Sequence, residues 1–434
     1  YVILYLKEIL RISMSNKIKV LTISDHPLSP SGVGTQTKYV CEALLNSGKF
    51  EILSLGGAIK HNDYRPITVG EWGEEWRIIP IDGYGNHEII RSIIRNEKPD
   101  IVWIMTDPRF WEWLWAIENE IRALCPIVYY HVWDNYPYPM YNRPYYLSND
   151  YVVSISKLTD DIVRNVAPEV NCAYIPHAVD QKHFAPVIDK IRDDFRKKTL
   201  SEADRDKFII FWNNRNARRK QSGTVLWWYK EWLDENDLSG KVLFIMHTDP
   251  HDGHGQDLVH IANQLEMPSG EVLFSRDKVP LENMGAFYSI ADVTVNISDA
   301  EGFGLATLES LACGTPIIVT VTGGLQEQVM SNGELFGVPL FPASKAIIGS
   351  QQVPYIYEDR ICKKDFFAAL SKIYNMTNEE RRALGMKGAN HVNENYNFKK
   401  FGDSWVKHML DVYETQGSWS TRRDYTSITF KEIA

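Results

Sequence analysis

Short apolar runs alternate with longer amphipathic stretches along most of the chain, and this alternation predicts the fold. In the first half, runs rich in Val, Ile and aromatic residues predict strands at 18–23, 51–55, 101–105, 127–130 and 151–155. In the second half, similar runs predict strands at 208–212, 241–247, 272–274, 293–297 and 317–321. Strands that alternate with helices form parallel, doubly wound sheets, so we expect an α/β protein with two such domains.

The boundaries of the domains follow from the same pattern. We expect an N-terminal extension, a first domain, a second domain and a C-terminal segment, at residues 1–16, 17–185, 186–393 and 394–434. The extension is apolar but carries Lys7, Glu8 and Arg11, a composition typical of neither a signal peptide nor a membrane span. The run from Tyr396 to Tyr413 predicts an amphipathic helix in the C-terminal segment.

Composition narrows the functional classes. The 434 residues are 44% apolar and 24% charged, which is typical of a soluble globular protein, and the net charge of −9 argues against a general nucleic-acid-binding protein. The five cysteines are scattered and form no C-x-x-C pair, which argues against a zinc or disulfide framework and favours a reducing compartment. No apolar run approaches the length of a membrane span, so we expect a cytoplasmic protein.

The stretch from Ser298 to Thr320 carries the most specific chemical pattern. It reads S-D-A-E-G-F-G-L-A-T-L-E-S-L-A-C-G-T-P-I-I-V-T, with Glu301 and Glu309 separated by seven residues and two glycines in a loop between a strand and a helix. Ligands of open α/β sheets bind where such loops leave the strands, and free N–H groups at a helix start bind anions. Glu309 is suited to accept hydrogen bonds from sugar hydroxyls beside a phosphate. The alternative is a solvated pair of glutamates around an ordinary helix start.

This pattern resembles the C-terminal signature of family 4 glycosyltransferases, which are retaining enzymes of the GT-B fold that use nucleotide-activated sugars. The resemblance rests on Glu301-Gly302-Phe303-Gly304-Leu305, Glu309, Gly314-Thr315-Pro316 and Thr322-Gly323-Gly324. It implies that Glu309 holds the nucleotide ribose, and that Glu301 faces the donor sugar and its diphosphate together with Gly302, Phe303, Gly304 and Leu305. It also implies two Rossmann-like domains facing across a cleft, with the C-terminal helix returning to the first domain.

A basic loop follows the strand predicted at 208–212. Four cations fall within six residues, and a loop of this kind is well placed to neutralise a diphosphate leaving group (Arg215, Arg218, Arg219 and Lys220). The resembled family has an arginine followed five positions later by a lysine at this loop, and Arg215 and Lys220 match that spacing, although Asn214 replaces the family's glycine. The alternative is a solvated basic helix start.

Two features of the first domain are candidates for the cleft wall. Gly32 and Gly34 lie in a loop that opens a helix after the first strand, and the resemblance implies that this loop faces the cleft; a plain turn is the alternative. His131 ends the strand predicted at 127–130, where the family often places a histidine near the reacting carbon of the donor sugar. The alternative is a histidine bonded into the cleft wall without a chemical role.

Two clusters match metal-binding patterns but lack the context that metal binding requires. The segment from His247 to His254 contains three histidines and two aspartates, yet it reads as a loop without a helical pair of histidines. Asp204 and Asp206 form a D-x-D, yet they precede a predicted strand instead of ending one. We therefore expect no metal.

The sequence favours a nucleotide-sugar-dependent, hexosyltransferase-type glycosyltransferase that retains the anomeric configuration. The donor would bind the second domain and the acceptor the first, with a glycan, a lipid-linked molecule or a protein as acceptor; peripheral contact with a membrane stays open. Arg215 and Lys220, with the N–H groups near Gly304, would stabilise the departing diphosphate, and Glu301 and His131 complete the catalytic set. No cofactor and no nucleic-acid partner are expected. A sugar-nucleotide epimerase and a non-catalytic protein that binds sugar nucleotides or glycans are the alternatives.

Overall fold

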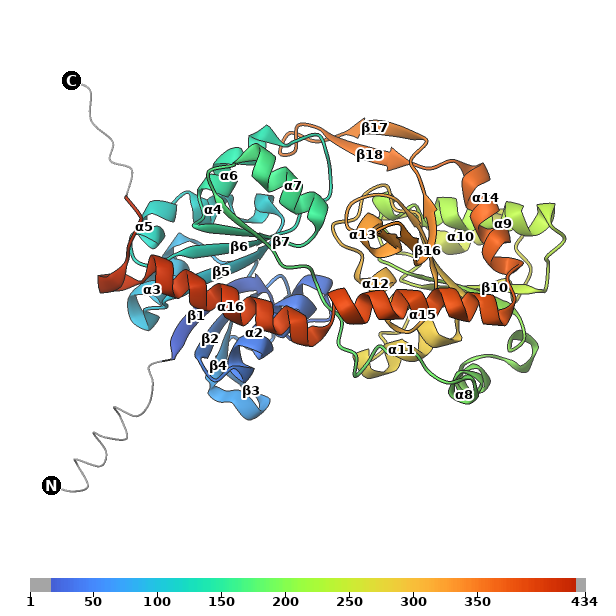
Figure 1. Cartoon of the computed structure of the whole chain (residues 1–434), viewed down its shortest axis with the longest axis horizontal. Coiled ribbons are helices and arrows are strands. Elements are labelled where there is room, and N and C mark those ends of the chain that lie inside the picture. The colour runs from blue at the N-terminus through green and yellow to red at the C-terminus, as the bar shows by residue number, and fades with distance from the viewer. Residues whose placement is uncertain (1–16, 427–434) are drawn as a thin grey trace.

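The computed structural model describes residues 17–426, so the predicted extension at 1–16 and the end of the C-terminal segment, 427–434, lie outside the described residues. Two α/β domains lie side by side, each built on a largely parallel sheet with helices packed against it (Figure 1). The predicted fold class is therefore confirmed. Among the described residues, no helix has the length and apolar character needed to cross a membrane.

The first domain is built on an eight-stranded sheet in the order β3-β4-β2-β1-β5-β6-β7-β8. Its strands are β1 (Ile18–Asp25), β2 (Phe50–Gly57), β3 (Ile67–Val69), β4 (Gly73–Pro80), β5 (Ile101–Thr106), β6 (Ile127–His131), β7 (Tyr151–Ser154) and β8 (Asn171–Tyr174). Its helices are α2 (Gly32–Asn46), α3 (His87–Glu97), α4 (Glu112–Trp115), α5 (Glu118–Arg122), α6 (Arg143–Leu147) and α7 (Lys157–Val166). Only the pairing of β3 with β4 is antiparallel in this sheet.

The second domain is built on a six-stranded parallel sheet in the order β11-β10-β9-β12-β13-β16. Its strands are β9 (Phe208–Asn213), β10 (Val242–His247), β11 (Val272–Ser275), β12 (Val293–Asn296), β13 (Ile317–Thr320) and β16 (Gly337–Leu340). Its helices are α8 (Asp189–Thr199), α9 (Ser222–Glu235), α10 (Leu258–Gln264), α11 (Leu281–Ile290), α12 (Leu305–Ala312), α13 (Leu325–Val329) and α14 (Lys363–Tyr374). Two hairpins, β14–β15 (Met330–Ser331, Glu334–Leu335) and β17–β18 (Ser344–Ile348, Ile356–Arg360), lie outside the sheet.

The sequence pattern predicts ten of these strands and misses the less apolar ones. In β4, charged residues occupy positions around Trp76 and Ile78, and these two side chains are fully buried. The hairpin β17–β18 has only the short apolar run at residues 346–348, and most residues of its first strand are exposed. Strands at the margin of a sheet bury fewer side chains, so their hydrophobic pattern is weaker.

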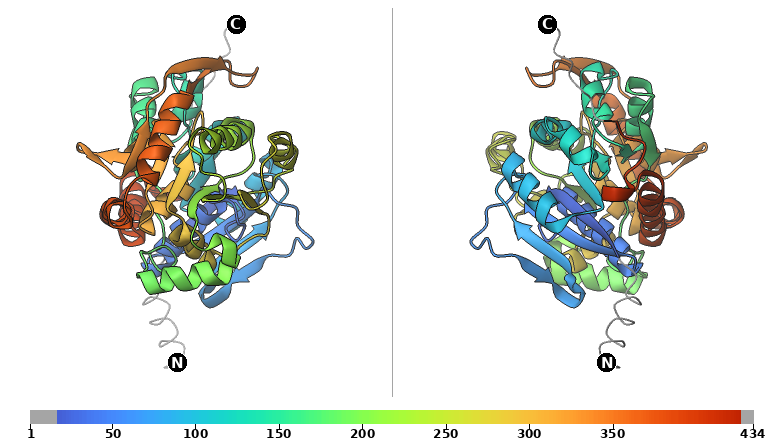
Figure 2. Two further views of the ribbon diagram at one scale, coloured as in Figure 1. Left: turned by 90° about the vertical axis from the view of Figure 1, so that its right-hand side faces the viewer. Right: turned by 90° about the vertical axis from the view of Figure 1, so that its left-hand side faces the viewer.

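Two end-to-end helices run along both domains. Helix α15 (Asn378–Asn395) packs on α12 of the second domain, and α16 (Phe398–Gln416) packs on α2 of the first (Figure 1). The break between them arises because Asn397 caps α16, accepting a hydrogen bond from the N–H of Lys400. Trp405 then buries its ring in the first domain, 4.8 Å from the ring centre of Tyr130. In the end-on views both helices lie on one flank of the molecule (Figure 2).

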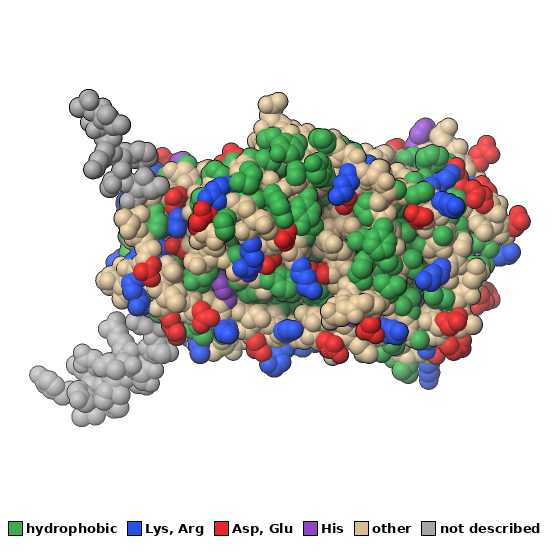
Figure 3. All heavy atoms as spheres, turned by 45° about the horizontal axis from the view of Figure 1, so that its top comes forward, with side chains coloured by type: hydrophobic (Ala, Val, Ile, Leu, Met, Phe, Trp, Pro, Cys, Tyr) green, Lys and Arg blue, Asp and Glu red, His purple; other side chains and the backbone are tan. Residues whose placement is uncertain are grey.

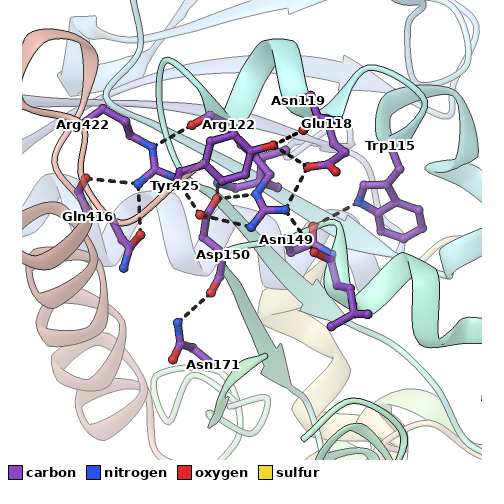
Figure 4. Close-up of polar contacts among 12 residues, drawn as sticks. Trp115, Glu118, Asn119, Arg122, Asn149, Asp150, Asn171, Gln416, Arg422 and Tyr425 are labelled. Carbon is purple, nitrogen blue, oxygen red and sulfur yellow. Dashed lines mark hydrogen bonds and ion pairs between the residues drawn. The ribbon is translucent and has the colours of Figure 1, made fainter. Parts of the chain in front are cut away.

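A buried ion-pair network fastens the chain after α16 to the first domain (Figure 4). The guanidinium of Arg422 lies 2.6 Å from Oδ1 of Asp150, and Arg122 lies 3.1 Å from Oδ2 of the same carboxylate. Arg422 also donates to the carbonyl oxygen of Arg122. Tyr425 packs its ring against both guanidiniums. The C-terminal segment is thereby an integral part of the first domain up to the end of the described chain.

Candidate functional site

The glycine loop between β12 and α12 is shaped by a close backbone contact. Gly304 has a φ of 93°, and a side chain there would lie 2.4 Å from Cδ2 of Leu325. A side chain at Gly323 would lie 1.7 Å from the carbonyl oxygen of Glu301. Only glycine fits at either position, which lets the loop pack directly on the turn that precedes α13.

The same loop meets the first domain and the segment that joins the domains. A side chain at Gly302 would lie 3.4 Å from Val132 of the first domain, and one at Gly32 would lie 3.2 Å from Cδ1 of Leu305. The buried ring of Phe303 lies edge-on to His177, in the segment between β8 and α8, with 5.1 Å between ring centres. The structure thus brings the predicted loop residues of both domains together at the start of α12.

Glu301 forms a buried ion pair with Lys220. The ammonium of Lys220 contacts Oε2 of Glu301, and both residues are buried. Burial lowers the pKa of Lys220 to about 8. Burial also acts to raise the pKa of Glu301, but the charges of Lys220 and Arg219 outweigh it and hold that pKa below its usual range. The pair is possible because β9 and β12 are neighbours in the sheet, so the loops that follow them adjoin.

Arg219 links this pair to the first domain. Its guanidinium lies 3.8 Å from Oε2 of Glu301 and 3.7 Å from Oδ2 of Asp134, which follows β6. It also donates to the carbonyl oxygen of Ala300. Burial raises the pKa of Asp134, and the nearby Arg219 acts against this rise. Sequence reasoning missed Asp134, although its place after a predicted strand end was the available signal.

The other two cations of the basic loop have separate partners. Arg215 lies 2.7 Å from Oδ2 of Asp252 and 2.7 Å from Nδ1 of His254, and its side chain is 61% exposed. Arg218 donates to both carboxylate oxygens of Glu358 on β18, at 2.8 and 2.5 Å. The sequence predicts that Arg215 and Lys220 both face a bound diphosphate; in this structure the cation that stands beside Lys220 at Glu301 is Arg219. All four cations are matched by carboxylates in this structure.

The loop from His247 to His254 supplies the partners of Arg215. Its Asp252 and His254 are occupied by the guanidinium of Arg215. Asp204 lies 2.8 Å from the ammonium of Lys207. Within residues 17–426, no three His, Cys, Asp or Glu side chains gather in an arrangement that could hold a metal ion.

Glu309 lies on α12 and is held by a tyrosine that the sequence reasoning missed. The hydroxyl of Tyr288 donates to Oε2 of Glu309 at 2.6 Å, and Nδ2 of Asn213 donates to the Tyr288 hydroxyl at 2.8 Å. Burial raises the pKa of Glu309 from 4.5 to about 7, and the Tyr288 hydrogen bond acts against this rise. Oε1 has no hydrogen-bond partner among residues 17–426 and remains available to a ligand.

The raised pKa of Glu309 predicts a pH-dependent stability difference. Between pH 5 and 7 the folded chain keeps a proton on Glu309 that the unfolded chain has released, so this contribution to stability is present at low pH and lost as the pH rises through 7. The free energy of unfolding of Glu309→Gln should therefore rise relative to the wild-type value from pH 5 to pH 8. Urea titrations across this range measure it, and a constant difference would show that Glu309 titrates normally.

His131 is enclosed within the first domain. Its Nδ1 lies 2.9 Å from the hydroxyl of Tyr129 and its Nε2 lies 2.9 Å from the hydroxyl of Tyr146. The side chain has no exposed surface, and burial lowers its pKa to about 3. With both ring nitrogens bonded inside the domain, the geometry favours the alternative of a wall histidine without a chemical role.

The loop with Gly32 and Gly34 forms the capped start of α2. The hydroxyl of Ser31 accepts a hydrogen bond from the N–H of Gly34 and donates to Oδ2 of Asp25 at 2.6 Å. A side chain at Gly34 would lie 2.4 Å from Oγ of Ser29. The loop is therefore a tightly packed helix start that lies against Leu305 of the second domain.

Part of the second domain is similar in sequence to known glycosyltransferases. Residues 264–340 match the family model of glycosyl transferases group 1. The D-inositol 3-phosphate glycosyltransferase of Corynebacterium jeikeium is 32% identical over 154 residues, which are 35% of this chain and 36% of that protein. The protein of the same name from Paenarthrobacter aurescens is 39% identical over 59 residues, 14% of each chain. The chain thus matches well under half the length of these curated relatives.

Solved structures resemble the chain over nearly all of its length. Sucrose-phosphate synthase from Thermosynechococcus elongatus has a TM-score of 0.71 at 18% identity, covering 92% of this chain and 100% of that one. HepE of Anabaena, in complex with UDP and glucose, has a TM-score of 0.64 at 12% identity, covering 91% and 100%. Likeness at such identities shows the fold alone. The chain therefore has the GT-B fold, and its residues 264–340 match glycosyl transferases group 1.

Proposed function

We propose that this protein is a retaining glycosyltransferase that moves a sugar from a nucleotide-activated donor to a hydroxyl group of an acceptor. The observation that carries the proposal is the start of α12, where the glycine loop holds the Glu301–Lys220 pair beside the first domain and the helix carries the tyrosine-held Glu309. The match to glycosyl transferases group 1 supports the reaction class. The name of the relatives, D-inositol 3-phosphate glycosyltransferase, supports glycosyl transfer, and the UDP and glucose bound to HepE support a nucleotide-sugar donor.

In this proposal the basic loop exchanges partners when the donor binds. The diphosphate approaches the N–H groups at the start of α12 and draws Lys220 and Arg219 away from Glu301. Glu301 then accepts a hydrogen bond from a hydroxyl of the donor sugar. As the bond between the anomeric carbon and the diphosphate oxygen breaks, negative charge grows on the leaving group, and the two cations stabilise it more strongly than in the bound donor.

Glu309 and Asp134 take the remaining roles in the proposal. Oε1 of Glu309 accepts hydrogen bonds from the ribose hydroxyls, while Tyr288 fixes the orientation of its carboxylate. Asp134 lies on the first-domain side of the ion-pair cluster, and in the proposal it holds Arg219 beside the donor. Donor and acceptor then meet between the two domains, where water can be excluded.

Nucleotide release tests the reaction class. We expect the purified chain to bind one class of sugar nucleotide, seen as a raised melting temperature, and to release the free nucleoside diphosphate only when an acceptor is added. Inversion at a carbon of the donor sugar without acceptor, with or without release of the nucleotide, would instead indicate an epimerase. Binding with neither release nor inversion would indicate a non-catalytic protein. Proton NMR of the initial product should show the donor's anomeric configuration; an inverted product would contradict the retaining reaction.

We expect transfer to proceed in excess EDTA. Arg219 and Lys220 supply positive charge at the proposed diphosphate site, so neutralisation of the leaving group requires no divalent ion. The initial rate of nucleotide release, measured with and without EDTA after dialysis, should differ by less than twofold. Loss of activity that manganese restores would assign the leaving-group charge to a metal and contradict the role given to these two cations.

A further inference from the structure

The hairpin β17–β18 belongs to the second half of the chain but reaches the first domain. It extends from β16 across the top of the molecule toward α6 and α7 (Figure 1). Val353, in the turn between its strands, is 9% exposed and belongs to the hydrophobic core of the first domain, together with Trp133 and Tyr146. Apolar side chains gather on the face that carries the hairpin (Figure 3). The hairpin is therefore anchored in the opposite domain.

The backbone of β18 and the preceding turn hold the segment that follows β6, which we call the wall loop (residues 132–142). The N–H of Tyr357 donates to the carbonyl oxygen of Tyr136 at 2.6 Å, and Nδ2 of Asn135 donates to the carbonyl oxygen of Tyr357 at 2.6 Å. The hydroxyl of Tyr141 donates to the carbonyl oxygen of Tyr355 at 2.9 Å. The wall loop also contains Asp134, the first-domain partner of Arg219.

The next residues of β18 hold the basic loop of the second domain (residues 215–220). Glu358 is 2% exposed and receives both terminal nitrogens of Arg218. The N–H of Asp359 donates to the carbonyl oxygen of Asp299 at 2.9 Å, and Arg360 lies 2.6 Å from Oδ1 of Asp299. Asp299 in turn donates its N–H to the carbonyl oxygen of Arg219. The basic loop is thus fixed to β18 through both a side chain and the backbone.

Tyr357 and Glu358 are consecutive, so a single step along β18, about 3.8 Å, separates the contact to the wall loop from the contact to the basic loop. We propose that β18 is a spacer between these two loops and that Glu358 is its positioning residue, so that a nucleoside diphosphate bound at the basic loop orders the wall loop. This inference rests on the proposed function for the identity of the ligand. In the proposal Glu358 touches neither donor nor acceptor; it acts through Arg218, and Arg360 of the same strand lies 3.1 Å from its Oε2.

The charge of Glu358 gives the proposal a distinctive consequence. Glu358 binds both terminal nitrogens of Arg218, and without that bond Arg218 would keep only the longer contact to Asp299, at 3.9 Å, and could attract a diphosphate more strongly. Its replacement by glutamine should therefore leave nucleotide affinity unchanged or increase it, while uncoupling the wall loop. A residue that only stabilises the fold would lose affinity and order together.

Hydrogen exchange of the full chain with UDP, GDP and ADP tests the proposal. The matched control is Asp359→Asn, which removes the same charge from the neighbouring position of β18 but leaves the bonds of Glu358 intact. For the nucleotide that binds, peptides covering residues 132–142 should exchange at least threefold more slowly in the wild type and in Asp359→Asn. In Glu358→Gln this protection should be absent, while calorimetry gives a Kd equal to or below that of the wild type.

The outcomes separate the inference from the proposed function. Protection in Glu358→Gln equal to that in the control, or a joint loss of affinity and protection, would overturn the spacer role. If none of the three nucleotides binds the wild type, the proposed function fails, and exchange without ligand decides the spacer role. Faster exchange of residues 132–142 in Glu358→Gln than in Asp359→Asn then supports it, and equal rates overturn it.

Discussion

Replacing Lys220 with alanine is expected to cost about 2–4 kcal/mol of transition-state stabilisation, mostly in kcat, because its ammonium meets the leaving diphosphate when negative charge is greatest. Lys220 is buried beside Glu301, so few water molecules can replace the missing charge. Steady-state rates of nucleotide release with saturating donor and acceptor measure the effect. The variant should remain folded, because Arg219 stays 3.8 Å from Oε2 of Glu301 and still balances its charge.

Two matched variants locate this effect at the ion-pair cluster. Lys399→Ala removes a lysine that is 84% exposed on α16, and it should leave the rate unchanged. Arg215→Ala should reduce the rate less than Lys220→Ala, because Asp252 and His254 already occupy its exposed guanidinium. Equal losses for Arg215→Ala and Lys220→Ala would restore the pair that the sequence spacing indicated and would contradict the partition seen in the structure.

The sequence predicts the sheets well because their central strands are buried on both faces. The runs at 101–105 and 293–297 are continuous stretches of mostly apolar residues, and each lies in the interior of its sheet. The hairpin β17–β18 escapes such reasoning, since Val353 is buried in a core with Trp133 and Tyr146, which lie more than two hundred residues earlier in the chain. Contacts between residues far apart in the chain produce no local periodicity of apolar residues in the sequence.

The sequence predicts the loops of the candidate site, but it does not predict which side chains form ion pairs and hydrogen bonds there. The glycines around Glu301 indicate a close backbone approach, and the structure has that approach at Gly304 and Gly323. Arg219 shares the short helical turn at Arg218–Lys220 with Lys220, whereas Arg215 precedes that turn and binds Asp252, and the spacing in the sequence does not reveal this difference. Tyr288 supports Glu309 from a different helix, and no spacing in the sequence connects these two residues.

Replacing Glu309 with alanine is expected to weaken nucleoside diphosphate binding by about 1.5–3 kcal/mol, the scale of a hydrogen bond to a charged group. Calorimetry with the nucleotide that binds the wild type measures the change. Folding should be retained, because burial disfavours the charged carboxylate and its removal relieves that cost. Tyr288→Phe keeps the carboxylate but removes the hydroxyl that orients it, so it should lose a smaller part of the affinity.

The pH dependence of nucleotide binding shows whether Glu309 accepts hydrogen bonds from the ribose or is only a structural carboxylate nearby. Ribose hydroxyls donate to an ionised carboxylate more strongly than to a protonated one, so binding should favour the charged form of Glu309 and release a proton. Because the free protein holds Glu309 near a pKa of 7, wild-type affinity should rise from pH 6 to pH 8. In Glu309→Gln the affinity should rise less over this range. The rise that remains comes from titration of the phosphate and of other groups. Equal pH profiles in the two proteins, or an unchanged affinity in Glu309→Ala, would remove Glu309 from the nucleotide site.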